Sequence, residues 1–321
     1  MKIAVLTYGD LGGSYQTAPR GTYAYIHFLE QFGHRVIHAD CAGWRLSWAM
    51  LRMLRREKPD VVVGQHGGAM LAAVWRRTGL IACPVVHAWD DYYAEQSLLP
   101  AWFVWPLEKL SVTGADHITS VSRYNVHLAE RWGKPATFIP HGVTPDQRPG
   151  PMVLESPRLK VVYLGDQSLY KGMTKLMEAM RGAEAELFMV GTVNPALQSL
   201  APANVRFMGR IPPEEVLSVL SQADVLVNPS DQDSNFKLQE YIRAGKPILG
   251  VTGRMEWAFE HGRTAWICAD LAEGLARLAA DPALRERLAA GARSLSYLTW
   301  EQTVRRLEAV LLAVAESARR P

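Results

Sequence analysis

The chain has 321 residues, of which 48% are hydrophobic and 21% charged, and its formal net charge at pH 7 is +3. This composition is typical of a folded protein with room for two domains of about 150 residues each. Its small net charge excludes a nucleic-acid-binding protein on electrostatic grounds.

The sequence shows no sign of a membrane span or an oxidising compartment. No apolar run approaches the roughly 20 residues of a spanning helix, and the apolar run at the N-terminus is too short for a signal peptide. The three cysteines, Cys41, Cys83 and Cys268, have no metal-ligand spacing and are expected to be reduced. A cytoplasmic protein is therefore expected.

In the first half of the chain, short apolar runs alternate with helical stretches. Alternation at this spacing predicts an α/β fold with a parallel, doubly wound sheet. The predicted strands are residues 3–6, 35–39, 61–64, 84–88, 117–120 and 137–139.

The basic stretch 44–58 is expected to form a helix. Trp44 and Trp48 would lie with Leu51 on one stripe, and Arg52 and Arg56 with Arg45 on another. Such a helix can lie on an anionic membrane surface. Alternatively, it covers the sheet and leaves a solvated basic face.

Residues 144–157 are rich in proline and polar residues and form the expected linker, which gives domains at 1–150 and 151–321. The second half repeats the α/β scheme and ends in a helix predicted over about 300–315. Its predicted strands are residues 160–164, 187–190, 205–207, 225–227, 248–251 and 266–268.

The stretch 223–250 indicates a binding site. A buried strand is followed by a polar loop carrying Asp231, Asp233, Asn235 and Lys237, and then by a predicted helix carrying Glu240. Amide donors at a helix start suit anionic or hydroxyl oxygens, and a carboxylate can chelate two vicinal hydroxyls. An ordinary strand–loop–helix is the alternative interpretation.

Glycine-rich loops follow the first strand of each half. In the second half, the loop 165–172 carries Gly165 and Lys171 between a strand and a helix, so its amides and its lysine can face phosphate oxygens. In the first half, Gly12 and Gly13 would let the backbone approach a phosphate closely. A surface loop and a plain tight turn are the respective alternatives.

Seven segments, in the same order along nearly the whole chain, resemble the motifs of the retaining glycosyltransferases of family 4, also called group 1 glycosyltransferases. They read MKIAVLTYGDLGG, FGHRV, ADHITSVS, IPHGV, VYLGDQSLYKG, KLQEY and AGKP. The resemblance implies the GT-B architecture, in which two Rossmann-like domains face each other across a cleft. An N-terminal domain would bind the acceptor and a C-terminal domain the nucleotide sugar, with the last helix packing back on the N-terminal domain.

The resemblance also implies an activity, which is transfer of a sugar from a UDP- or GDP-linked donor to an acceptor hydroxyl, with retention and without metal or further cofactor. Glu240 would bind the ribose and Lys171 the diphosphate. The remaining donor-binding positions are Gly12, Gly13, Gly165, Gly191, Gly209, Arg210, Ile211, Asn235, Phe236, Lys237 and Leu238.

Three positions depart from the family pattern. Asp166 and Gln167 occupy the place of an arginine, whose charge Lys237 or Arg210 could supply. The first acid of the family's acid pair falls on Gln232, and Asp233 is the chosen replacement. The family's N-terminal-domain histidine falls on Asp90, with His87 three residues earlier. Lys171, Asp90, His87 and Asp233 are therefore the catalytic candidates.

Several alternatives remain open. Asp231 and Asp233 spell the D-x-D motif that binds a metal–diphosphate in another glycosyltransferase fold. An inverting transfer with Asp90 as base, a nucleotide-sugar epimerase and an inactive partner subunit are further alternatives. The acceptor is expected to be a glycan, a lipid-linked molecule or a small molecule. A peripheral contact with the inner membrane face is a further hypothesis.

Overall fold

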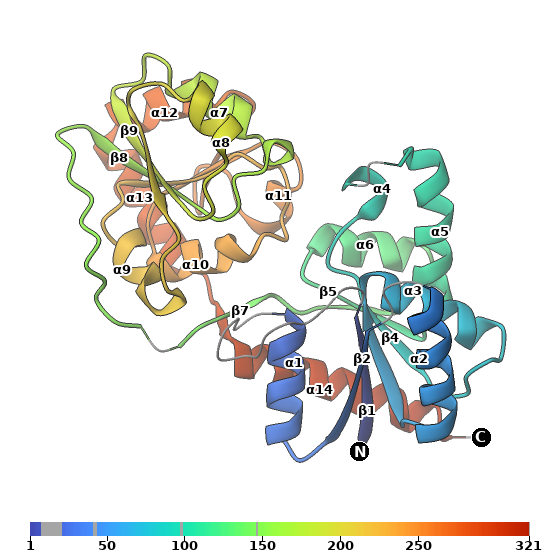
Figure 1. Ribbon diagram of the computed structural model, residues 1–321. Coiled ribbons are helices and arrows are strands. Elements are labelled where there is room, and N and C mark those ends of the chain that lie inside the picture. Colours follow the sequence, from blue (N-terminus) through green and yellow to red (C-terminus); the bar gives the residue numbers. More distant parts are fainter. Residues whose placement is uncertain (8–20, 41–43, 97–98, 146, 321) are drawn as a thin grey trace. The chain divides into compact units, whose positions relative to one another are not determined.

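The computed structural model describes residues 1–7, 21–40, 44–96, 99–145 and 147–320 (Figure 1). Its chain forms two compact units. Unit 1 comprises Met1–Gly142 with Leu298–Pro321, and unit 2 comprises Val143–Tyr297.

The stretch between the units is attached to unit 2. The backbone N–H of Arg148 donates to the carbonyl of Glu214 (2.9 Å), and that of Leu154 donates to Oε1 of Gln222 (2.9 Å). These bonds fasten the proline-rich segment before the first strand of unit 2, so the division falls at 142/143 rather than at the expected 150/151. A second crossing at 297/298 places the last helix in unit 1.

Unit 1 contains a six-stranded parallel sheet in the order β2-β1-β3-β4-β5-β6. All six predicted strands are present, which confirms the doubly wound sheet of the first half. The elements are β1 Lys2–Thr7, α1 Gly21–Gln31, β2 Arg35–Asp40, α2 Trp44–Glu57, β3 Val61–Gln65, α3 His66–Arg77, β4 Val85–Ala88, α4 Tyr93–Gln96, α5 Ala101–Gly114, β5 His117–Ser120, α6 Arg123–Arg131, β6 Ala136–Phe138 and α14 Trp300–Ser317.

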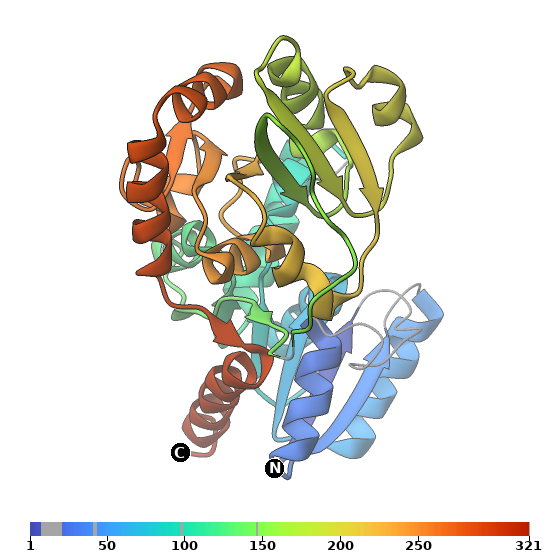
Figure 2. The same ribbon diagram turned by 90° about the vertical axis from the view of Figure 1, so that its left-hand side faces the viewer.

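Helices cover both faces of the unit 1 sheet because its strands are apolar on both sides. One core lies between the sheet and helices α2, α3, α5 and α6. The other lies between the sheet and helices α1 and α14, where Leu29 packs with Leu307 and Leu311. Figure 2 shows α14 beside α1, so the two ends of the chain meet on this face.

Unit 2 contains a second six-stranded parallel sheet, in the order β10-β9-β8-β11-β12-β13. This is the strand order of dinucleotide-binding Rossmann folds, and all six predicted strands are again present. The elements are β8 Leu159–Leu164, η1 Leu169–Lys171, α7 Met173–Met180, β9 Ala185–Val190, α8 Pro195–Leu200, β10 Val205–Gly209, η2 Pro213–Glu215, α9 Val216–Leu220, β11 Val225–Asn228, α10 Phe236–Ala244, β12 Ile248–Val251, α11 Met255–Ala258, β13 Trp266–Cys268, α12 Leu271–Ala280 and α13 Pro282–Arg293.

Two layers of helices enclose this sheet as well. Helices α7, α8, α12 and α13 pack on one face, and α9, α10 and α11 on the other. A short two-stranded sheet pairs β7 Gly142–Val143 with β14 Leu298–Thr299, at the point where the chain passes between the units.

The basic stretch 44–58 forms the expected helix, α2. Leu51, which belongs to the expected membrane-facing stripe, and Leu54 are buried in the unit 1 core, so this part of the helix packs on the sheet. Trp48 remains exposed, as do Arg52 and Arg56. The Trp44 and Arg45 side chains lie outside the described part. Across the described chain, no helix combines the length and apolar composition needed to cross a bilayer.

Candidate functional site

The carboxyl ends of parallel strands define where a ligand binds in a doubly wound sheet, at the point where the strand order reverses. In unit 2 this point lies between β8 and β11. The loops after these two strands are residues 165–172, which carry Gly165 and Lys171, and residues 229–235, which carry Asp233 and Asn235.

Glycines bring the backbone segments after β8, β9 and β10 into direct contact. The N–H of Gly165 donates to the carbonyl of Val190 (2.8 Å), and the N–H of Gly191 donates to the carbonyl of Gly209 (2.8 Å). Gly191 has φ = 142°, and a Cβ there would lie 2.0 Å from the Gly165 carbonyl oxygen. Only glycine fits this position.

The loop 165–172 holds its lysine against an acid. Lys171 Nζ lies 3.3 Å from Asp166 Oδ2. Gln167, the other residue at the family's arginine position, is fully buried and accepts a hydrogen bond at Oε1 from the N–H of Asn194 (3.1 Å). Neither residue supplies the missing positive charge. Gln167 instead fixes the loop to the N-terminus of α8.

Lys237 lies buried on the other side of the switch point. It is 6% exposed, its Nζ donates to Oδ1 of Asn228 (3.4 Å), and the ammonium lies 4.7 Å from the centroid of the Tyr163 ring. None of the described carboxylates forms an ion pair with it. Burial lowers the pKa of Lys237 to about 7, the Lys171 charge lowers it further, and Asp166 opposes this shift. A buried cation with this little compensation favours an anionic ligand.

Glu240 lies on α10, and its carboxylate has an oxygen with no hydrogen-bond partner among the described residues. This atom, Oε2, is buried. Burial raises the pKa of Glu240 to about 7, while the charge of Arg243 lowers it. Next to it, the Tyr241 hydroxyl accepts from Leu164 N (3.0 Å) and donates to Val227 O (3.1 Å), which fixes α10 across β8 and β11.

The other predicted donor-site residues of α10 have different environments. Asn235 is the N-cap residue of the helix and Phe236 is exposed, so both can reach a ligand. The Leu238 side chain is buried in the core, which leaves only its backbone for binding.

The structure also shows the environments of the predicted site residues that lie in loops. Arg210 is exposed after β10, and Ile211 packs against the core. Asp233 is buried and Asp231 is exposed. Within the described residues, these two aspartates do not join a third histidine, cysteine or acid in a metal-sized cluster.

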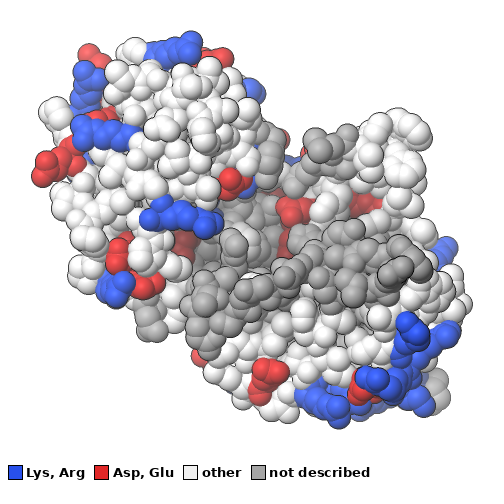
Figure 3. Space-filling view, in the orientation of Figure 1, with Lys and Arg blue, Asp and Glu red and all other residues white. Residues whose placement is uncertain are grey.

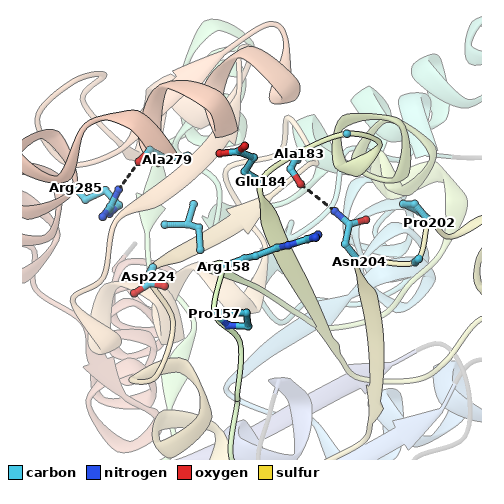
Figure 4. Close-up of a pocket in the computed structure, with 12 residues that line it drawn as sticks. Pro157, Arg158, Ala183, Glu184, Pro202, Asn204, Asp224, Ala279 and Arg285 are labelled. Carbon is cyan, nitrogen blue, oxygen red and sulfur yellow. Dashed lines mark hydrogen bonds between the residues drawn. The ribbon is translucent and has the colours of Figure 1, made fainter.

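A hollow at the opposite edge of the unit 2 sheet is not the candidate site (Figure 4). It lies at the amino ends of β8–β11, and its polar side chains serve the fold. Asn204 Nδ2 donates to the Ala183 carbonyl (3.3 Å), Asp224 Oδ2 accepts from Lys160 N (2.8 Å), and Arg285 donates to the Ala279 carbonyl (3.2 Å). Parallel sheets bind ligands at their carboxyl ends.

In unit 1, Asp90 follows β4 at the carboxyl edge of the sheet. Gln65, the last residue of β3, donates from Nε2 to Oδ2 of Asp90 (3.1 Å), and Thr22 of α1 donates to Oε1 of Gln65. Burial, together with repulsion from Asp91, raises the pKa of Asp90 to about 8, although the bond from Gln65 lowers it. Asp90 is therefore largely protonated at neutral pH.

Glu108 anchors the loop that carries Asp90. Its buried carboxylate accepts hydrogen bonds from Nε1 of Trp89 (2.8 Å), the N–H of Tyr93 (2.8 Å) and the N–H of Ala94 (2.9 Å). This arrangement fixes both ends of the segment around Asp90.

His87 lies in a different environment. It is 1% exposed within β4, where Ser111 of α5 lies 3.2 Å from its Nδ1 atom. The structure thus places His87 between the sheet and α5, while Asp90 joins Gln65 at the sheet edge. The predicted Gly12 and Gly13 lie outside the described residues.

Gln65, Asn228 and Tyr241 belong to these clusters but were not predicted from the sequence. Gln65 and Asn228 are the last residues of buried strands, and this polar strand-end position is the signal that could have identified them. Tyr241 gave no such signal, because its role depends on the distance between two strands.

Two family profiles match the chain, and together they span both units. The profile described as "Glycosyl transferase 4-like domain" matches residues 4–142, and that described as "Glycosyl transferases group 1" matches residues 158–281. The chain belongs to the group 1 glycosyltransferases. This confirms the family resemblance seen in the sequence.

Among characterised proteins, this group 1 glycosyltransferase is similar to the D-rhamnosyltransferase WbpZ of Pseudomonas aeruginosa. The two are 25% identical over 244 residues, which is 68% of this chain and 64% of the relative. The match thus spans less than two thirds of the relative's length.

Solved structures share the fold of this group 1 glycosyltransferase. Sucrose-phosphate synthase of Thermosynechococcus elongatus is similar with a TM-score of 0.76 at 16% identity, over 98% of this chain and 99% of that one. Anabaena Alr3699/HepE, solved in complex with UDP-glucose, gives a TM-score of 0.72 at 14% identity, over 98% and 100% of the two chains. The α/β architecture with two parallel sheets is that of GT-B glycosyltransferases.

Proposed function

We propose that the enzyme transfers a sugar from a nucleoside-diphosphate sugar to an acceptor hydroxyl, with retention of anomeric configuration and without a metal ion. In this proposal, unit 2 binds the donor at the switch point between β8 and β11, and unit 1 binds the acceptor at the sheet edge that carries Asp90. UDP is the first nucleotide to test, because a protein of the same fold is solved with it.

Buried Lys237 is the observation that carries the donor assignment. Its ammonium lies where the loops after β8 and β11 meet, close enough to Lys171 for repulsion to lower its pKa. A diphosphate bound there would be stabilised by both cations, and its charge increases as the sugar leaves. The two lysines can therefore stabilise the leaving group without a metal ion.

Glu240 supports a ribose site beside the phosphates. A buried carboxylate oxygen without a partner among the described residues can accept a hydrogen bond from a ligand hydroxyl. The position of Glu240, one turn along α10 from Lys237, places both on the helix that begins at the switch point. Ribose and diphosphate are adjacent in a nucleoside diphosphate, as this arrangement requires.

Calorimetric titration with UDP in the presence of EDTA tests the donor site. We expect UDP to bind the wild type, and Lys237→Met to weaken binding by about 1.5–3 kcal/mol, the usual contribution of a charged hydrogen bond. Lys175→Met, an exposed lysine on α7, is the matched control and should bind normally. Equal affinities for all three proteins would contradict the assignment of Lys237.

Product analysis tests the reaction. Incubation with UDP-sugars and acceptors, followed by NMR of the product, should show transfer and the same anomeric configuration as in the donor. An inverted product would support the inverting mechanism with Asp90 as base. Conversion of one UDP-sugar into its epimer would identify an epimerase, and nucleotide binding without turnover would identify a partner subunit.

A further inference from the structure

The outer face of α5 carries a run of exposed apolar residues that the proposed reaction does not use. Phe103, Leu107 and Leu110 recur at intervals of four and three residues, with Trp102 and Pro106 beside them, so they form one stripe along the helix. The exposed fractions are 77% for Trp102, 48% for Phe103, 43% for Leu107 and 37% for Leu110. We call these five residues the aromatic face of α5.

The opposite side of α5 shows that the helix itself is securely placed. Val112 is buried in the unit 1 core, Glu108 anchors the Asp90 loop, and Ser111 contacts His87. The aromatic face is therefore the solvent-exposed side of a helix whose other side is packed on the unit 1 core. Contiguous exposed apolar residues of this kind mark an interaction surface.

Helix α2, in the same helical layer as α5, supplies positive charge. Helices α2, α3 and α5 form part of the same layer on one face of the unit 1 sheet. Arg52, Arg55 and Arg56 of α2 are exposed, and so is Arg77 of α3. Among the described side chains of these three helices, no acidic residue is exposed to a comparable degree, because Glu57 is half-buried and Glu108 is buried.

Figure 3 shows both features on one view of unit 1, where the surface over α5 is white and Lys and Arg gather over the end of α2. Tryptophan and phenylalanine prefer the boundary between lipid headgroups and acyl chains. Arginines in the same helical layer attract anionic headgroups, each by about 1 kcal/mol. This combination of charge and aromatic residues fits an anionic lipid bilayer.

We propose that the enzyme docks on anionic membranes through the aromatic face of α5, with the arginines of α2 contacting lipid headgroups. The helix starts at the carboxyl edge of the sheet, shortly after Asp90 and α4. Docking would therefore bring the proposed acceptor site close to the bilayer surface, which favours an acceptor carried on a lipid. The acceptor class rests on the proposed function, whereas the docking surface does not.

Vesicle flotation of the full chain tests the docking. The variants are Trp102→Ser/Phe103→Ser on α5 and Arg52→Ser/Arg56→Ser on α2. The matched control is Leu312→Ser, which changes an exposed apolar residue of α14 on the other face of the sheet. Vesicles of phosphatidylglycerol with phosphatidylcholine are compared with phosphatidylcholine alone, at low and high salt.

We expect the wild type and the Leu312→Ser control to float with anionic vesicles, and high salt to weaken this binding. The aromatic variant should bind at least about fivefold less, because two large apolar side chains no longer enter the bilayer. The arginine variant should lose the preference for anionic lipid. Thermal unfolding checks that each variant is folded. If the double variant is unfolded, the single variant Trp102→Ser, at the most exposed position, replaces it in the assay.

Three outcomes would overturn the proposal. One is that the wild type binds neither kind of vesicle, and another is that the folded aromatic variant floats like the wild type. The third is that the wild type forms a dimer and binds no vesicles, while the aromatic variant is a monomer. The aromatic face would then be a contact between two copies of the chain. UDP titration without vesicles separates this proposal from the proposed function, since the wild type and the aromatic variant should bind UDP equally.

Discussion

Asp166 holds Lys171 in an ion pair within a single loop, with Nζ and Oδ2 3.3 Å apart. Ser168 donates a further hydrogen bond to the same carboxylate. An arginine stands near this position in the family pattern, so this enzyme has an acid where a second cation is expected. A donor diphosphate bound at Lys171 must therefore compete with Asp166, and Lys237 is the nearby cation that can take the place of the arginine.

Removal of the Asp166 charge should improve donor binding. In Asp166→Asn, Lys171 loses its competing partner, and we expect UDP to bind about three to tenfold more tightly, equivalent to about 0.6–1.4 kcal/mol. Calorimetry measures this change. Glu178→Gln, an exposed acid on α7, alters the net charge equally and should leave the affinity unchanged. Weaker binding to Asp166→Asn would show that the acid itself contacts the donor.

Donor affinity should pass through a maximum near pH 7. The Lys237 ammonium is charged below its pKa of about 7, and the Glu240 carboxylate is ionised above its pKa of about 7. Affinity should therefore fall on the alkaline side as Lys237 loses its proton, and on the acidic side as Glu240 gains one.

Titrations of UDP across this pH range, at constant salt, check the two limbs. Lys237→Met should remove the alkaline limb and Glu240→Gln the acidic one. An affinity that is independent of pH in the wild type would exclude both residues from the donor site.

Glu240 should also reduce the stability of the unliganded protein. Its pKa is raised by folding, from its ordinary value to about 7, so the folded state loses stability as the pH rises through this interval. At pH 8 we expect Glu240→Gln to raise the free energy of unfolding by about 1–2 kcal/mol while weakening UDP binding. At pH 4 the stabilisation should disappear. Denaturant titrations at both pH values measure the change, and a variant less stable at pH 8 would contradict it.

Both parallel sheets could be predicted from the sequence because each strand is a short apolar run between helical stretches. Val61–Gln65 and Val225–Asn228 illustrate this, since both are wholly buried and end on a polar residue. The division between the units could not be predicted as well. Proline and polar residues in 144–157 indicate a linker, but the hydrogen bonds that fix Arg148 and Leu154 to unit 2 join residues more than sixty positions apart.

The candidate site was predictable where one loop or helix carries it. Lys171, Lys237 and Glu240 lie beside the switch point, as their position after β8 and β11 required. The partner of Asp90, in contrast, comes from a distant part of the chain. Gln65 ends β3 and reaches Asp90 just after the neighbouring strand β4, and no local pattern reports such a contact.

Gly191 should be essential for folding at the carboxyl ends of β8 and β9. Its φ of 142° is strained for any other residue, and a Cβ would meet the Gly165 carbonyl oxygen at 2.0 Å. We expect Gly191→Ala to destabilise the protein by about 3 kcal/mol or more, a value typical of severe steric conflict. Gly182→Ala is the matched control, because Gly182 has φ = 79° with open space around it. Gly182→Ala should lower the free energy of unfolding by only about 1–2 kcal/mol, which is the penalty for a left-handed backbone alone.

Asp90 should act as a hydrogen-bond donor to a substrate hydroxyl rather than as a base. Burial and repulsion from Asp91 raise the pKa of its carboxyl group to about 8 despite the hydrogen bond from Gln65, so near neutral pH it is mostly protonated. Transfer should therefore decline as the pH rises through about 8. The amide of Asp90→Asn can still donate, and we expect this variant to retain activity within about tenfold while losing the decline above pH 8.

The opposite pH dependence would identify a base. If Asp90 accepted the acceptor's proton, transfer would rise with pH through about 8, and Asp90→Asn would lose about 10²–10⁴-fold in rate. Gln65→Glu provides an independent check, because a second carboxyl group beside Asp90 should raise the pKa of the pair and move the decline to higher pH. Measurement of kcat/KM from pH 6 to 10 for the three proteins distinguishes the two roles.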